Sequence, residues 1–284
     1  MMKVEQSAIP GIPGVNSGVD DEEKFGREDV AKILKKFKKN LAGEKFLTEP
    51  DDRTLMTFLR TKRYDLVQAE KLLKTYDEFR RKHGQNWLKI SKTEYKTVFA
   101  SGVLDLLDEK DKRGRRVLWL RAGKWIQKLH TADQCLKIGG LMAELAFLIE
   151  SQVDPYSGCV AIIDMEGFSM TQLKGVTPSF VRKLMHYLVS CLAMRIFTAH
   201  VIRESSGFAV VFALFRKFID DRMRKRIFFH QHDMNSLADS VGLDILPLEL
   251  GGPCLSDPEK WVRLLDDPKI IQELEKIGYT FVED

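Results

Sequence analysis

The side chains best suited to chemistry do not form a known catalytic or metal-binding set in this sequence. There is no G-x-G-x-x-G, P-loop, G-x-S-x-G or H-E-x-x-H motif. The six histidines include one close pair, His230 and His232, which we do not expect to bind a metal. Asp164 and Glu166 follow an apolar run, where α/β enzymes often place carboxylates. Capping of the turn before Gly167 is nevertheless the favoured interpretation of this pair.

The cysteine content and the net charge also give no sign of a catalytic or nucleic-acid-binding protein. The four cysteines, Cys135, Cys159, Cys191 and Cys254, are scattered without a C-x-x-C pair, so we expect reduced thiols. Because no nucleophile is visibly paired with a base, the sequence predicts a protein that is not an enzyme and needs no cofactor. A net charge of +4 is too small for an obligate nucleic-acid binder, so no nucleic-acid partner is expected.

One stretch, residues 206–229, combines an apolar stripe with a basic segment. Large apolar residues recur there at helical spacing, on one face: Phe208, Val211, Phe212, Phe215 and Phe218. Residues 216–226 hold six basic and two acidic residues. Such an element indicates a movable cover or a contact with a membrane surface. A core helix followed by a solvated basic helix is the alternative.

The surrounding elements divide the chain into four parts. We expect a flexible tail at 1–20, a small helical unit at 21–87, an α/β domain at 88–255 and a helical extension at 256–284. Strands are predicted at 115–121, 159–164, 199–202 and 227–229, alternating with long helices, which is typical of a largely parallel sheet. No uninterrupted apolar run approaches ~18 residues, so we expect a cytoplasmic protein whose membrane contact is peripheral.

The segments around this sheet carry an excess of large apolar residues. They are Trp119, Leu136, Phe147, Ile163, Phe168, Tyr187, Leu188 and Met194, together with the stripe at 208–218. The helix predicted at 132–152 also carries small residues, among them Gly139, Gly140 and Ala143. An ordinary core explains each large residue singly. Small residues that face large ones across a sheet would fit a cavity better.

The order of five segments resembles the CRAL-TRIO (Sec14-like) lipid-transfer family over nearly the whole chain after about residue 25. The segments are TLMTFLRTKRYDLVQAEKLL, RRVLWLRAGKW, GCVAIIDMEGFS, AHVIRESSGFAVVFALFRKFIDDRMRKRI and DILPLELGGP. The similarity is greatest to the branch of tocopherol-transfer, retinaldehyde-binding and clavesin proteins. It implies a three-helix unit, an α/β lipid cage and a mobile gate helix within 206–229.

The resemblance also implies binding residues. An apolar cage would be lined by Leu136, Gly139, Ala143, Ile163, Phe168, Tyr187, Leu188 and Met194 and by the gate phenylalanines. Phosphoinositide headgroups would be held by Lys62, Arg195, Arg222 and Arg226, all of which are basic here. Departures from the family pattern include Met194 in place of a buried glutamate, which disfavours phosphatidylinositol exchange. Residues 203–206 replace the usual Asn-x-Pro, and Arg216-Lys217 replaces Lys-Pro in the gate.

Two functions therefore stay open. The first is a carrier that holds a small hydrophobic lipid, such as a tocopherol or retinoid, and exchanges it at phosphoinositide-containing membranes. The second is a phosphoinositide-binding trafficking adaptor of the clavesin type, for which Arg222 and Arg226 would matter and the cavity would not. An enzyme acting on lipids is disfavoured because no nucleophile, base or metal set is visible.

Overall fold

The amino-terminal part of the chain is a helical unit. The computed structural model describes residues 27–150, 158–204 and 208–283, so the predicted tail lies outside the described residues. The helices of this unit are α2 (Arg27–Asn40), α3 (Asp52–Thr61), α4 (Leu66–His83) and the short α5 (Gln85–Leu88). Asp51 and Asp65 start α3 and α4 because their side chains accept backbone N–H groups that the first turns leave unpaired.

A five-stranded sheet forms the centre of the molecule, in the order β2-β3-β4-β5-β6. The strands are β2 (Leu104–Leu106), β3 (Arg116–Arg121), β4 (Cys159–Asp164), β5 (Ile196–Ile202) and β6 (Ile227–Phe229). All neighbours pair in parallel except β2, which is antiparallel to β3. The predicted α/β fold, preceded by small helices, is therefore confirmed. The antiparallel strand β2, only three residues long, is an element the sequence pattern did not reveal.

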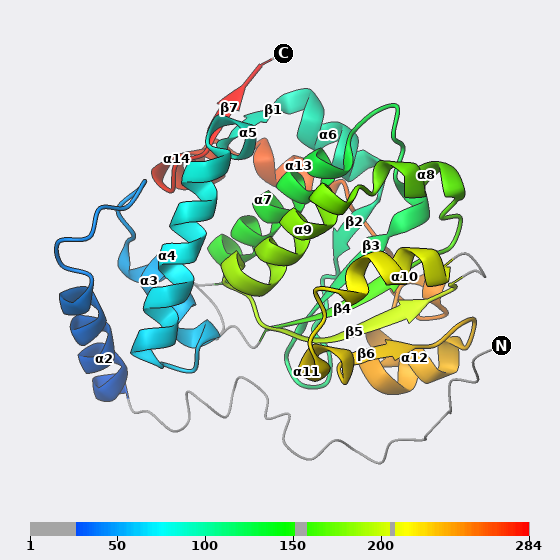
Figure 1. Ribbon diagram of the computed structural model, residues 1–284, viewed down its shortest axis with the longest axis horizontal. Coiled ribbons are helices and arrows are strands. Elements are labelled where there is room, and N and C mark those ends of the chain that lie inside the picture. Colours follow the sequence, from blue (N-terminus) through cyan, green and yellow to red (C-terminus); the bar gives the residue numbers. More distant parts are fainter. Residues whose placement is uncertain (1–26, 151–157, 205–207, 284) are drawn as a thin grey trace.

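Helices cover both sides of this sheet (Figure 1). On one side lie α7 (Ala132–Glu150), α9 (Pro178–His186) and α10 (Phe208–Arg216), and on the other lies α12 (Met234–Val241). We call these two surfaces of the sheet the α9 face and the α12 face. In the view of Figure 1, the short helix α8 (Met170–Gly175) lies above α10, and the short helix α11 (Asp221–Arg224) lies below its left end. A π-helical turn at Tyr187–Cys191 follows α9 directly.

The carboxyl-terminal segment packs onto the first two parts of the chain. Phe99 of α6 (Lys92–Ala100) stacks on Trp261 of α13 (Lys260–Leu265) with the ring centroids 6.2 Å apart. Beyond α14 (Pro268–Lys276), the strand β7 (Thr280–Val282) pairs in parallel with β1 (Lys89–Ser91). The Arg80 guanidinium donates to the carbonyl of Ile277. The weak helical pattern at this end thus forms two helices, and it also ends in a strand that was not predicted.

Candidate functional site

The α9 face of the sheet is less completely packed than the α12 face. On the α12 face, Val117 and Trp119 of β3 are 0% and 1% exposed, and Val160, Ile162 and Ile202 are also fully buried. Side chains of β3 that point the other way, Leu118 and Leu120, are only half-buried. Parallel sheets covered by helices normally bury both faces. The sheet therefore carries incompletely buried apolar side chains under its α9 face.

Residues from three elements meet on this α9 face. Leu120 is in register with Ile163 of β4, so both side chains point to the same side, and both are half-buried. Gly139 of α7 faces Leu104 of β2, whose Cδ1 would lie 3.4 Å from a Cβ at that glycine. Leu104 is in register with Leu120, which places α7 over the same face. The other predicted residues of α7, Leu136 and Ala143, are buried, and Phe147 is half-buried.

Trp119 does not belong to this group. Its side chain packs in the separate cluster between the sheet and α12, with the Arg121 guanidinium 4.1 Å from the centre of its ring. Successive side chains of a strand alternate between the two faces, so Trp119 must point away from its neighbours Leu118 and Leu120. We therefore remove Trp119 from the predicted lining.

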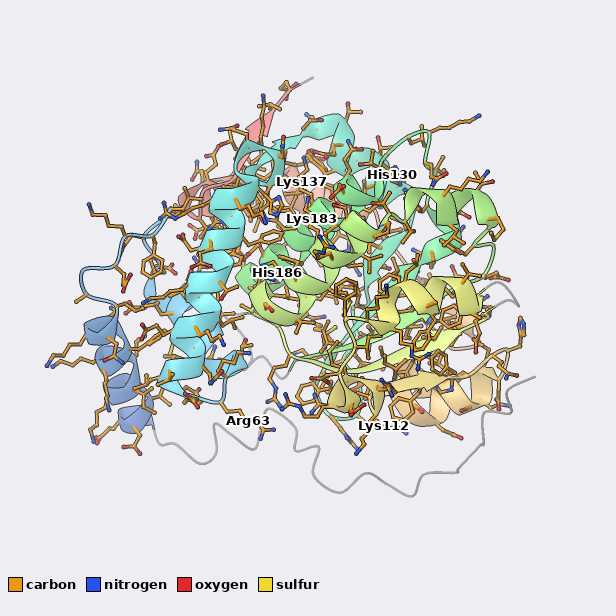
Figure 2. All side chains as sticks on the ribbon, in the orientation of Figure 1. Arg63, Lys112, His130, Lys137, Lys183 and His186 are labelled. Atoms are coloured by element: carbon orange, nitrogen blue, oxygen red, sulfur yellow. The ribbon has the colours of Figure 1, made fainter. Side chains whose placement is uncertain are left out.

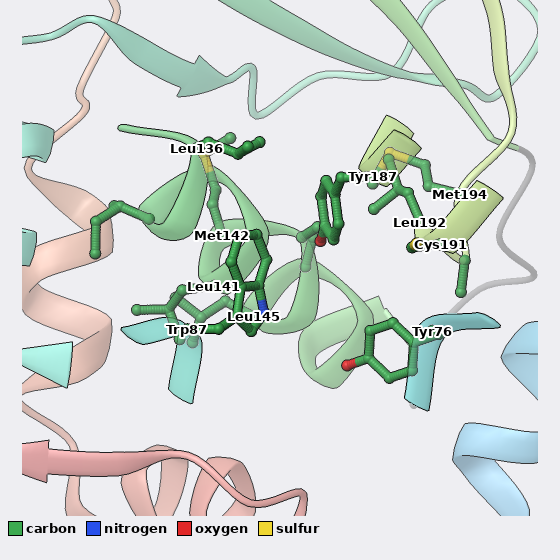
Figure 3. Close-up of a cluster of buried hydrophobic side chains, with 14 of the residues drawn as sticks. Tyr76, Trp87, Leu136, Leu141, Met142, Leu145, Tyr187, Cys191, Leu192 and Met194 are labelled. Carbon is green, nitrogen blue, oxygen red and sulfur yellow. The ribbon is translucent and has the colours of Figure 1, made fainter. Parts of the chain in front are cut away.

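Tyr187 is also placed elsewhere than predicted. Its ring lies 4.9 Å from that of Trp87 and 5.3 Å from that of Phe79, between α9 and the amino-terminal unit (Figure 3). Gly140 makes this contact possible, because a Cβ there would lie 2.6 Å from the Trp87 ring. The small residues of α7 thus have two roles: Gly140 admits an aromatic cluster, and Gly139 faces the sheet. Met194 is buried near Leu192 in the same core, whereas Phe168 and Leu188 are half-buried.

The predicted gate segment lies over β6 on the α9 face. Phe208 and Phe212 of α10 stack 5.9 Å apart, and both contact Phe229 of β6 at 5.8 and 5.6 Å. Phe215 is half-buried. The helix ends at Arg216, so Phe218 follows it rather than continuing its stripe. The side chain of Val211 lies outside the described residues.

Two of the four predicted phosphoinositide residues are brought together from distant parts of the chain. The Thr61 hydroxyl donates to the carbonyl of Ala193 at 2.7 Å, which fixes the end of α3 beside the start of β5. Burial and the neighbouring Arg195 lower the pKa of Lys62, as expected for two cations held close together. Arg222 and Arg226 are exposed, and Arg222 lies 3.8 Å from the carboxylate of Asp220.

The parallel topology extends this basic surface. Arg116, Arg195 and Arg226 stand at or directly before the starts of β3, β5 and β6. Parallel strands begin at one edge of a sheet, so these three residues share that edge, which we call the basic edge. Arg63 and Lys112 lie toward the same side of the molecule in Figure 2. Arg116 was not among the predicted residues, because only the parallel register of the strands brings it to this edge.

The residues first considered for catalysis have structural roles. The Asp164 carboxylate accepts the backbone N–H of Glu166 at 3.0 Å and lies 3.0 Å from the Arg203 guanidinium, although burial raises its pKa. His230 pairs with His200, the Nε2 and Nδ1 atoms being 2.9 Å apart. Burial raises the pKa values of the Cys135 and Cys191 thiols to about 12. Within the described residues, no group of three side chains could hold a metal ion.

An open hollow of about 500 Å³ lies elsewhere on the surface. It is bordered by Lys112, Leu243, Asp244, Gly251, Gly252 and Pro253. No residue of the predicted lining or of the predicted phosphoinositide set borders it, so we assign it no part in the site.

Comparison with known proteins identifies the family. The CRAL/TRIO domain model matches residues 101–252, more than half of the chain, and the chain therefore belongs to this lipid-binding and lipid-transfer family. The human alpha-tocopherol transfer protein-like protein is 31% identical over 205 residues, covering 72% of this chain and 59% of its own length. Clavesin-1 of Xenopus laevis is 29% identical over 228 residues, which are 79% and 68% of the two chains.

A solved structure shares the fold. The crystal structure of Sfh5 superposes with a TM-score of 0.53 at 14% identity, covering 87% of this chain and 99% of that one. The names of these relatives denote transfer proteins or clavesins and no enzyme. No helix among the described residues is long and apolar enough to span a membrane.

Proposed function

We propose that this protein is a cytoplasmic carrier that holds a small hydrophobic lipid between the α9 face of its sheet and the covering helices. The observation that carries this proposal is the half-buried state of Leu118, Leu120 and Ile163 on a sheet face that helices cover. Incomplete burial of apolar side chains costs about 25 cal/mol per Å² left in contact with water. A bound lipid would remove that cost.

The proposed ligand is apolar and is recognised mainly by shape. Gly139 and Ala143 provide room on α7 without a hydroxyl group, and Met194 offers no charge to a headgroup. Phe168 and Leu188 extend the same apolar surface. A compact hydrophobic molecule of the tocopherol or retinoid kind suits such a lining better than a phospholipid headgroup, and the relative named as transfer protein-like supports this class.

Exchange is proposed to occur when α10 moves at a membrane. Its phenylalanines are half-buried, so exposing them costs about 1 kcal/mol each, roughly half the value for full burial. A basic residue near an anionic leaflet gains about 1 kcal/mol. The free energy gained when Lys62, Arg195, Arg222 and Arg226 dock on the membrane is therefore of the same order as the free energy needed to move α10. Insertion of the phenylalanines into the bilayer interface supplies the rest of the free energy that this movement needs.

A peripheral adaptor that recognises phosphoinositides is the second candidate. The closeness of Lys62 and Arg195, whose neighbours Thr61 and Ala193 are hydrogen-bonded, favours it, because two nearby cations can attract an anion whether or not a lipid occupies the interior. The similarity to clavesin-1 supports this alternative. For this function the basic edge would be needed and the α9 face would not.

A transfer assay between liposomes separates the two candidates. The double variant Phe212→Asp/Phe215→Asp should abolish transfer of a fluorescent hydrophobic ligand while leaving the fold intact, as circular dichroism would show. Arg222→Ala/Arg226→Ala should instead reduce binding to phosphoinositide vesicles and retain the bound ligand. Normal transfer by the phenylalanine variant would contradict the carrier, and vesicle binding without any bound lipid would favour the adaptor.

A further inference from the structure

A second exposed apolar surface lies away from the α9 face and from the basic edge. Ile126, Leu129 and Met170 are 47%, 58% and 60% exposed. Ile126 and Leu129 belong to the connection between β3 and α7, and Met170 is the first residue of α8. We call these three residues the α8 platform.

The connection that presents Ile126 and Leu129 is held rigidly. The backbone N–H groups of Leu129 and His130 donate to the carbonyl of Ile126 at 2.9 and 3.2 Å. The buried Trp125 indole donates its Nε1–H to the carbonyl of His130 at 2.9 Å. The two apolar side chains are therefore displayed on a closed turn with an aromatic anchor beneath it.

Helix α8 is joined to this turn. The buried Gln172 amide donates to the carbonyls of Gly123 and Trp125, both at 3.0 Å. In return, the Gln127 amide donates to the carbonyl of Gln172 at 3.2 Å. A Cβ at Gly175 would collide with Trp125 and Gln127, so a glycine is required for this close approach. The three exposed side chains thus belong to one preorganised unit.

The charged residues within the two segments that form the α8 platform are all basic, and the exposed Glu166 beside Gly123 is paired with Arg203. Residues 122–131 and 168–175 contain three lysines, Lys124, Lys128 and Lys174, and no acidic residue. All three lysines are exposed, and none forms an ion pair with another residue in the part of the chain that the structure describes. Large exposed apolar side chains among unpaired lysines match an anionic bilayer surface, in which apolar groups insert and ammonium groups meet headgroups.

We propose that the α8 platform is a second membrane-docking point that recognises anionic lipid without selecting phosphoinositides. The proposal rests on the proposed function and adds a second contact to it. In Figure 2, His130 at the end of the turn lies far from Arg63 and Lys112, which lie toward the basic edge. In Figure 1, α10 lies between α8 and α11. Docking at both places would therefore hold α10 against the bilayer in one orientation.

The test uses the full chain and phosphatidylcholine vesicles that contain phosphatidylserine but no phosphoinositide. The variant Ile126→Ser/Leu129→Ser/Met170→Ser should lower the vesicle-bound fraction in co-sedimentation, with about a tenfold loss of affinity, since each lost contact is a partly inserted apolar side chain. A matched control, Val67→Ser/Leu243→Ser/Leu255→Ser, removes three residues that are 71%, 53% and 78% exposed elsewhere, and it should bind as the wild type.

A second variant tests the charges. Lys124→Gln/Lys128→Gln/Lys174→Gln should also weaken binding to these vesicles and should reduce its dependence on salt. Wild-type binding by either platform variant, or an equal loss in the serine control, would overturn the proposal. Neither variant should change the amount of bound lipid or the phosphoinositide-dependent binding through Arg222 and Arg226. Absence of bound lipid from the wild-type protein, with normal loss of vesicle binding in the platform variants, would instead count against the proposed carrier and leave the second docking point standing.

Discussion

The two faces of the central sheet are built from the same kinds of residue, yet they are packed to different degrees. Ile162 and Ile163 are adjacent and identical in type, and they point to opposite sides of β4. Ile162 is fully buried against α12, whereas Ile163 under α7 and α9 is only half-buried. Protein interiors are normally close-packed. The difference agrees with the proposed function, in which the α12 face supplies stability and the α9 face holds a lipid.

The largest expected effect comes from the packed face. Ile162→Ala should lower the free energy of unfolding by about 3 kcal/mol, because it leaves a cavity in a closed core. Ile163→Ala should cost only about 1 kcal/mol, since its surroundings already leave it partly uncovered. Urea unfolding of both variants would measure the contrast. Equal losses for the two isoleucines would show that the faces do not differ.

The second largest change in stability is expected when the pH is lowered, and it depends on the pair His200 and His230 on the α12 face. Burial lowers the pKa of His200 to about 3, whereas an unfolded histidine titrates near about 6.5. The folded protein therefore keeps His200 neutral while the unfolded chain takes up a proton, so stability falls as the pH drops below about 6.5. From pH 7 to pH 5 the loss should be about 2 kcal/mol.

Urea midpoints at these two pH values would measure this loss, with His200→Asn as the control. The variant should remove most of the change in stability between pH 7 and pH 5. His230, whose pKa burial also lowers, contributes in the same direction and remains in the variant. An unchanged pH dependence in the variant would assign the effect to other groups.

The smallest change in the free energy of unfolding is expected when a larger side chain is placed on the α9 face. Ala199 of β5 is half-buried and, by its register with Ala161, points to this face. Ala199→Leu should change the free energy of unfolding by less than about 1 kcal/mol and should reduce transfer of the ligand. Ala69→Leu, at a fully buried site, should cost about 1–3 kcal/mol through overpacking. A larger loss of stability at Ala199 than at Ala69 would contradict an unfilled space.

The sequence predicted the parallel strands well, because apolar runs such as Cys159–Asp164 separated by long helical patterns have few other interpretations. It did not assign side chains to faces correctly. Trp119 was included in the lining because of its size, although the alternation of β3 separates it from Leu118 and Leu120. Which of the two faces is the open one depends on how helices distant in sequence pack.

Other differences have local causes. A π-helical turn follows α9 and includes Tyr187, which the structure directs toward Trp87, and helical periodicity does not predict such a turn. The stripe of α10 ends at Arg216, so Phe218 falls beyond the helix that its spacing predicted. Lys62 and Arg195 are more than a hundred positions apart in the sequence, and only the resemblance to a family anticipated that they lie near each other.

If a lipid occupies the space on the α9 face, organic extraction of the purified protein followed by mass spectrometry should recover it. We expect one hydrophobic molecule per chain in the wild type and a much smaller amount in Ala199→Leu. The serine variant of the α8 platform should retain the full amount. A wild-type protein without bound lipid, or equal amounts of lipid in the wild type and in Ala199→Leu, would show that no lipid is held on the α9 face.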